Sequence, residues 1–154
     1  MDTWPTPPAG LPYVAVCAGG DWALGILSNG HIVASAISGS QDLATRAMRV
    51  NQDAISRGRR FVAISAGRSH ALGLLDNGEA VGWGDDDYGQ SSCTAAALSK
   101  AGGSRFLAVS VMENASMGLV DNGRIVIWGL TCVRYFRIEN NAPIGEGDCM
   151  QQTN

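Results

Sequence analysis

Residues 61–81 read FVAISAGRSHALGLLDNGEAV, and two further stretches of the chain align with them without gaps. These are residues 13–33, YVAVCAGGDWALGILSNGHIV, and residues 106–126, FLAVSVMENASMGLVDNGRIV, at spacings of 48 and 45 residues. Five columns are identical in all three stretches, and each stretch begins with an aromatic residue. A sequence period of this length indicates a repeat architecture.

Each repeat is predicted to form a small antiparallel sheet. Residues 61–65 and 70–75 are apolar and partly β-branched, which favours two strands, and residues 79–83 return as a third. Asn77-Gly78 is a strong hairpin signal between the last two strands. The other two repeats carry the same signal, as Asn29-Gly30 and Asn122-Gly123, and all three carry a mid-strand glycine, at Gly25, Gly73 and Gly118. We expect these mid-strand glycines to admit another backbone at close range. The pattern predicts an all-β fold, a partial β-propeller of about three antiparallel blade-like repeats.

The repeats divide the chain into segments. A proline-rich N-terminal arm covers residues 1–12, the three β repeats cover residues 13–130, and a divergent C-terminal tail covers residues 131–154. The repeats themselves are residues 13–42, 61–90 and 106–130, with connections at 43–60 and 91–105 that suit either a short helix or an outer strand. In the tail, VRYFRI can form one strand, and the residues after it read as a loop or a frayed end.

Three blades are too few to close a ring, so the two end units are expected to expose apolar flanks. The residues expected there are Val14, Val16, Leu24 and Ile26 on the first unit and Leu107, Val109, Leu119 and Ile125 on the third. Three states follow from this: a segment of a longer propeller, self-pairing into a homo-oligomer, or permanent docking in a larger complex, which we favour.

Composition excludes several classes of protein. The net charge is −3, 16% of the residues are charged and 45% are hydrophobic, which argues against a disordered chain and against a chain-wide nucleic-acid trap. The first basic residue is Arg46, and no apolar run is long enough for a membrane helix, so we expect a cytoplasmic or nuclear protein without a signal, transit or membrane segment.

Cysteines and histidines are too scattered to form a metal site. The four cysteines, Cys17, Cys93, Cys132 and Cys149, form no CxxC pair, and only two histidines accompany them. We therefore expect no metal and no cofactor, and reduced thiols, with a Cys132–Cys149 disulfide as an open alternative.

The middle unit resembles the regulator-of-chromosome-condensation repeat family. Residues 61–90 match its pattern at Ala66, Gly67, His70, Leu74, Gly78, Val81, Trp83, Gly84, Gly89 and Gln90. The flanking units are degenerate, with Trp22 in the place of the histidine and Val111-Met112 in the place of the Ala-Gly pair. The resemblance extends over residues 13–130 and implies a β-propeller. It implies no single function, because the family includes a nucleotide exchange factor for a small GTPase, ubiquitin-ligase substrate modules, ciliary scaffolds and a protein inhibitor of β-lactamase.

The sequence shows no catalytic set. His70 has no serine, cysteine or aspartate at a recognisable triad spacing, so we expect it to form hydrogen bonds within the blade. Trp83 and Trp128 are expected to pack within or between blades. We therefore expect no enzymatic activity. The sequence favours a non-enzymatic protein–protein interaction module or a small structural subunit of a larger assembly; the alternative is a guanine-nucleotide exchange or chromatin-associated regulator of a small GTPase.

Loop residues at the rim are the candidates for partner binding, because strand residues are committed to the sheet. They are Asp85, Asp86, Asp87, Tyr88, Asp21, Trp22, Arg68 and, in the tail, Tyr135 and Phe136. The aspartate triplet suits a solvated turn, a protein-binding rim or, least well, a calcium site, because the EF-hand pattern is absent. Charge reversal at Asp86 and Asp87 is expected to weaken a basic partner's binding while the fold stays intact.

A second candidate surface is the arginine-rich connection. It contains Arg46, Arg49, Arg57, Arg59 and Arg60 with few acids between them. These cations suit either a solvated connection or contact with an acidic protein, a lipid surface or phosphate. No aromatic residues are interleaved with them, so nucleic acid is not the expected partner, and protein partners are.

Overall fold

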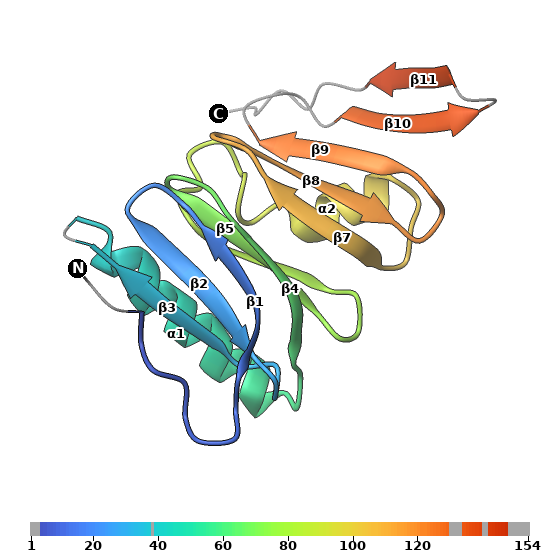
Figure 1. Ribbon diagram of the computed structural model, residues 1–154. Helices are drawn as coiled ribbons and strands as arrows, with labels where there is room; N and C mark the ends of the chain where they lie inside the picture. Colours follow the sequence, from blue (N-terminus) through green and yellow to red (C-terminus); the bar gives the residue numbers. More distant parts are fainter. Residues whose placement is uncertain (1–3, 38, 130–133, 140–141, 148–154) are drawn as a thin grey trace.

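Three antiparallel sheets lie side by side in the computed structural model (Figure 1). It describes residues 4–37, 39–129, 134–139 and 142–147, with side-chain environments up to residue 129. Sheet 1 consists of β1 (Tyr13–Ala18), β2 (Trp22–Leu27) and β3 (Ile32–Ala36), and sheet 2 of β4 (Phe61–Ala66), β5 (His70–Leu75) and β6 (Ala80–Gly84). Sheet 3 consists of β7 (Phe106–Val111), β8 (Ala115–Val120), β9 (Ile125–Gly129), β10 (Arg134–Glu139) and β11 (Ala142–Gly147). The sheets form an open array of blade-like units, as the repeats predict.

The hairpins form at the Asn-Gly pairs. Gly30, Gly78 and Gly123 have φ angles of 82°, 83° and 84°, a conformation that glycine adopts without strain. In each turn the asparagine Oδ1 accepts a hydrogen bond from the backbone N–H two residues later, at 3.0–3.1 Å. The turns also join the units: Phe61 N–H donates to Gly30 O, and Phe106 N–H donates to Gly78 O, both at 2.8 Å.

The mid-strand glycines make room for aromatic rings, and the prediction that they admit another backbone was wrong. A Cβ at Gly25, Gly73 or Gly118 would collide with the ring of Tyr13, Phe61 or Phe106, the aromatic residue that begins the same sheet. The first strand has a register irregularity beside each of these aromatics. Each ring therefore lies across the sheet, over the glycine.

Two helices occupy the connections in the described part of the chain. α1 (Gln41–Ser56) contacts β3 and β6, and α2 (Thr94–Lys100) contacts β6 and β9. Each helix thus lies along the third strand of the repeat in two neighbouring sheets, and both connections contain a helix where a helix or an outer strand was expected. Asn51 of α1 is buried and its Oδ1 accepts a hydrogen bond from Ile32 N–H at 3.0 Å, which ties the helix to β3.

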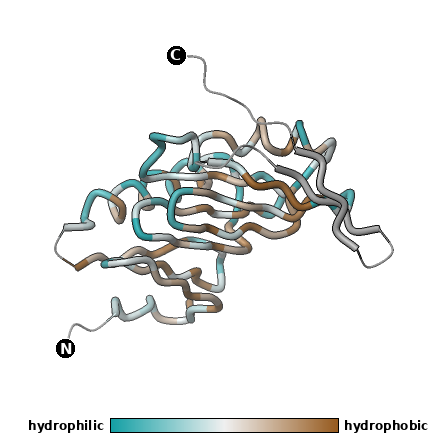
Figure 2. Tube along the Cα trace, turned by 90° about the horizontal axis from the view of Figure 1, so that it is seen from above, coloured by the Kyte–Doolittle hydropathy of each residue, from teal (hydrophilic) through white to brown (hydrophobic). Residues whose placement is uncertain are grey.

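The hydrophobic core has two parts, one on each side of sheet 2. The first joins sheets 1 and 2 with α1 and contains Trp22, Leu24 and Trp83. The second joins sheets 2 and 3 with α2 and contains Leu72, Phe106 and Trp128. Figure 2 shows hydrophobic residues running through the stacked strands and hydrophilic residues in the connecting loops. The prediction that Trp83 and Trp128 pack between blades is confirmed.

The two end sheets each leave one face uncovered by a further sheet. On sheet 1, Val16 is 72% exposed and Val14 is 64% exposed, and on sheet 3 Leu107 and Leu119 are also exposed. Val109 and Ile125 are partly buried, and Val109 packs on the second core. Leu24 and Ile26 were wrongly assigned to the open flank: they lie on the opposite face of sheet 1, where they are buried against sheet 2 and α1.

The described residues of the arm and of the tail lie against the first and third sheets, respectively. In the arm, the Trp4 and Tyr13 rings meet edge to face with centroids 5.8 Å apart, and Tyr13 Oη donates to Pro5 O at 3.0 Å. In the tail, β10 pairs with β9 and β11 pairs with β10. Residues 142–147 were expected to be a loop and instead form a strand, because β10 offers them an unpaired edge.

Candidate functional site

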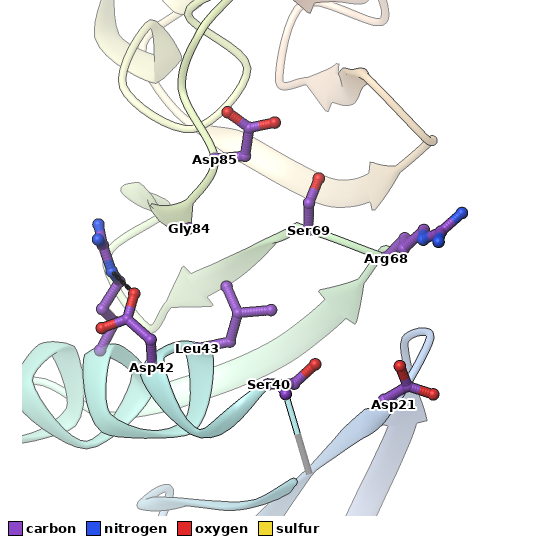
Figure 3. A pocket seen from close by; sticks show the side chains of 10 residues that line it. Asp21, Ser40, Asp42, Leu43, Arg68, Ser69, Gly84 and Asp85 are labelled. Atoms are coloured by element: carbon purple, nitrogen blue, oxygen red, sulfur yellow. Dashed lines mark hydrogen bonds and ion pairs between the residues drawn. The ribbon is translucent and has the colours of Figure 1, made fainter. Parts of the chain in front are cut away.

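The structure places a cavity of about 450 Å³ at one end of sheets 1 and 2. We call it the loop pocket. It lies where the β1–β2 loop, the β4–β5 loop, the start of α1 and the end of β6 meet (Figure 3). Its lining residues are Asp21, Gly39, Ser40, Asp42, Leu43, Arg46, Arg68, Ser69, Gly84 and Asp85. Three of the residues predicted to bind a partner, Asp21, Arg68 and Asp85, are thus brought to one place.

Some of the charged side chains that line the loop pocket form ion pairs with each other, and others do not. Arg46 Nε donates to Asp42 Oδ2 at 2.7 Å across one helical turn, so that pair is satisfied within α1. Arg68 and Asp21 form no ion pair within the part of the chain that the structure describes. Asp85 is held in place because its N–H donates to Ser69 O at 2.8 Å and its Oδ1 accepts from Asp87 N–H at 3.1 Å. Three acids and two bases give the lining a formal charge of −1.

The aspartate triplet divides into three different roles. Asp85 lines the loop pocket, whereas Asp87 and Tyr88 are exposed outside it. Asp86 Oδ1 accepts hydrogen bonds from Ser91 N–H, Ser91 Oγ and Ser92 N–H at 2.9–3.0 Å. Burial alone would raise the pKa of Asp86, but these bonds outweigh burial and hold its pKa below the usual value. Charge reversal at Asp86 would remove these contacts, so we expect it to disturb the structure of this loop as well as its charge.

Trp22 and the two tail aromatics are placed differently from Asp21. Trp22 is 3% exposed and its Nε1 donates to Gly67 O at 2.9 Å, so it is a core residue and its assignment to a partner-binding loop was wrong. Tyr135 and Phe136 belong to β10, where their backbones pair with Val126 and Ile125. Their side chains lie outside the described part of the structure.

The arginine-rich connection is largely paired with acids. Arg57 contacts both Asp53 and Glu79, while Arg59 and Arg60 lie 3.8 and 3.9 Å from Asp76. The hydrogen bond from Arg57 lowers the pKa of Glu79. Arg46 lies at the loop pocket, so the five arginines do not form one surface. The structure therefore favours a role in joining the connection to the β5–β6 turn over contact with phosphate.

His70 lies in a buried polar cluster between sheets 2 and 3. Its Nε2 is 2.9 Å from Ser116 Oγ, and that hydroxyl donates to Gln90 O at 2.9 Å, so His70 is the donor to Ser116. Trp128 Nε1 also donates to Gln90 O, at 3.0 Å. Burial lowers the pKa of His70, with Asp85 and Asp86 opposing the shift. The fully buried ring therefore has the structural role expected from the sequence.

Sequence reasoning missed the contribution of α1 to the loop pocket. Ser40 and Asp42 flank the beginning of this helix, and Ser69 follows Arg68 in the β4–β5 loop. A serine and an aspartate ahead of a long polar connection are a helix-start signal that could have indicated the first two. That the helix start meets the loops of two sheets depends on how the sheets pack, which the sequence pattern leaves open.

The described part of the chain shows no other chemistry-bearing cluster. Within it, no group of three or more His, Cys, Asp or Glu side chains is placed to hold a metal ion. Cys17 and Cys93 are free thiols, and burial raises the pKa of Cys17 to about 11, while Cys132 and Cys149 lie outside the described residues. Among the helices described, none is long and apolar enough to cross a membrane.

Comparison with solved structures identifies the fold. Human WBSCR16 superposes over 91% of this chain with a TM-score of 0.61 at 13% identity. The CRINKLY WD40 ectodomain of the Arabidopsis thaliana receptor kinase ACR4 covers 90% of the chain with a TM-score of 0.51 at 16% identity. Yeast RCC1 (Prp20), solved with Kap60 bound, covers 79% with a TM-score of 0.55 at 18% identity. The chain spans 39%, 51% and 30% of these structures, respectively.

Sequence comparison assigns the middle unit. The search of curated proteins found no match to this chain. Residues 61–90 match the family described as the regulator of chromosome condensation (RCC1) repeat. These residues are β4, β5, β6 and the loop through Gln90, the part of the molecule that separates the two cores. The chain therefore carries an RCC1 repeat at its centre, within an open three-sheet fold of the β-propeller type.

Proposed function

We propose that this chain is a non-enzymatic protein-interaction module that binds a basic side chain of a protein partner in the loop pocket. The observation that carries the proposal is the convergence of Asp21 and Asp85 on one cavity from loops of two different sheets. Arg46 is already bonded to Asp42, so a single cation, Arg68, stands against these two carboxylates, and the lining keeps an excess of one negative charge. A lysine or arginine of the partner would gain a charge-assisted hydrogen bond at either carboxylate.

The fold supports binding at this position. The strands and helices are fixed by the two cores, so the loops present their side chains from a rigid frame. The yeast RCC1 structure that shares the fold is a complex with another protein, Kap60, which agrees with an interaction role for this class of fold. No residue that lines the loop pocket favours guanine-nucleotide exchange over this role.

The test compares amide variants of the two carboxylates. Partners captured by the wild-type chain are identified by mass spectrometry, and the affinity of one purified partner is then measured by calorimetry. Asp21→Asn combined with Asp85→Asn keeps the side-chain shape and the acceptor for Asp87 N–H, and should weaken binding at least about tenfold. The matched control is Glu113→Gln, an exposed acid outside the pocket in the corresponding loop of sheet 3.

Two results would contradict the proposal. One is binding that survives the double variant, which would remove the loop pocket from the interface. The other is substrate turnover that disappears with His70→Ala, which would make the buried cluster catalytic.

A further inference from the structure

The uncovered face of sheet 1 carries a second cavity, of about 270 Å³. We call this face, with its cavity, the end wall. The cavity lies beside Trp4 and is lined by Ala18, Gly19, Ala23, Ser35 and Ile37, among others. Its surroundings are apolar and open, since Val16 on the same sheet and Ile37 are both exposed. A hollow in an exposed apolar face is typical of an interaction surface.

Sheet 2 has an equivalent face, formed by the corresponding residues of the second repeat, and a side chain of sheet 1 packs on it. Ala66, Gly67, Ala71 and Trp83 lie 48 residues after Ala18, Gly19, Ala23 and Ser35. The occupant is Trp22 of sheet 1. Its indole Nε1 donates to Gly67 O at 2.9 Å, and its ring belongs to the same buried cluster as Ala71 and Trp83.

The end wall preserves the features of the occupied wall that hold the indole. Gly19 and Gly67 have the same backbone environment, because Gly19 N–H donates to Trp22 O just as Gly67 N–H donates to His70 O. Ala18 and Ala23 repeat the small side chains Ala66 and Ala71. The main difference is Ser35 in the place of Trp83, which enlarges the space, and Trp4 of the arm borders it.

We propose that the end wall binds a tryptophan side chain of a partner protein, with the indole N–H donating to Gly19 O. A second copy of this chain is not the occupant, because the residue of sheet 3 that corresponds to Trp22 is Ala115. Nor does a histidine serve, because His70, which holds this position in sheet 2, bonds the Ser116 hydroxyl, and the residue of sheet 1 that corresponds to Ser116 is Ala23. The inference rests on the internal repeat, and the end wall shares one lining residue, Asp21, with the loop pocket.

The test uses a blocked Gly-Trp-Gly peptide titrated into the full isotope-labelled chain and followed by amide chemical shifts. We expect saturable shifts at residues 18–23 and 35–37 with a Kd of about 1 mM, a value typical of a single anchoring side chain. The Gly-Phe-Gly peptide should bind several-fold more weakly, because phenylalanine has no N–H for Gly19 O. Ala23→Met fills the cavity and should weaken binding at least tenfold.

The matched control is Ala108→Met, the same substitution on the exposed face of sheet 3, which should leave the titration unchanged. Asp85→Asn should also leave it unchanged, which separates the end wall from the loop pocket. The proposal is overturned if the wild-type chain shows no saturable shifts, or if Ala23→Met and the wild type titrate alike. It is also overturned if the wild-type chain associates with itself in sedimentation and Ala23→Met abolishes that association, because the end wall would then belong to a second copy.

Discussion

The interface between sheets 1 and 2 and the interface between sheets 2 and 3 use different polar anchors in the same position of the repeat. In the first, Trp22 Nε1 donates directly to a backbone carbonyl, and the Trp22 ring packs within an apolar cluster. In the second, His70 bonds the Ser116 hydroxyl, which in turn donates to the backbone carbonyl of Gln90. A large amphipathic ring can therefore replace a buried network, and each choice has different consequences for stability.

The largest difference is expected from removing the tryptophan that each interface has on the third strand of the repeat, Trp83 in the first interface and Trp128 in the second. Trp128→Ala should lower the free energy of unfolding by about 3–5 kcal/mol, as for other large-to-small core substitutions. Trp83→Ala should cost about 1 kcal/mol less, because Trp128 Nε1 bonds Gln90 O whereas Trp83 Nε1 has no partner among the described residues. Urea denaturation of both variants provides the measurement. An equal or greater loss for Trp83→Ala would show that the two interfaces do not differ in this way.

A smaller effect is expected from removing one polar group at each interface. Ser116→Ala leaves the buried N–H of His70 without an acceptor and should lower the free energy of unfolding by about 1–3 kcal/mol. Trp22→Phe removes only the donor to Gly67 O and should cost about 1 kcal/mol. Thermal and urea unfolding of both variants would compare the two losses of free energy. A larger loss for Trp22→Phe than for Ser116→Ala would contradict this prediction.

The smallest effect is a pH dependence that only the second interface possesses. Because burial lowers the pKa of folded His70, the unfolded chain takes up a proton first as the pH falls. Stability should therefore be complete above about pH 6.5, the ordinary histidine value, and fall as the pH drops from there toward the folded pKa. The measurement is urea unfolding at pH 7.5 and 5.5 for the wild type and for His70→Gln. The same pH dependence in both would assign it to other groups.

The repeat pattern predicted the sheets, their turns and their order, because hairpins and alternating apolar residues are local features. The Asn-Gly pairs and the three-strand units lie where the sequence placed them. What the pattern could not predict was the face on which each side chain lies. Leu24 and Val16 lie on neighbouring strands of sheet 1, yet Leu24 is buried and Val16 is exposed, because their side chains lie on opposite faces of the sheet. Which face is buried depends on which sheet packs beside it.

The sequence identified several residues of the candidate site, but it did not predict that they line one cavity. Asp21, Arg68 and Asp85 were identified as loop residues, and their meeting in one cavity follows from the packing of sheet 1 on sheet 2. Asp86 was predicted to bind a partner, but its carboxylate accepts hydrogen bonds from its own loop. The sequence of an acidic triplet does not show which of its carboxylates forms such bonds. Trp22 was misplaced because a degenerate position in a repeat reads as a variable loop, whereas here it is an anchor.

The bonds from Phe61 to Gly30 and from Phe106 to Gly78 have a consequence for how such a chain can change in length. Each unit begins by donating its first N–H to the turn of the unit before it, so every junction is built from the same two backbone groups. Gain or loss of one whole unit, 45 or 48 residues, keeps this backbone bond at every remaining junction, whereas gain or loss of part of a unit does not. Gene duplication can therefore lengthen this fold in whole repeats while the backbone bond at each seam stays the same.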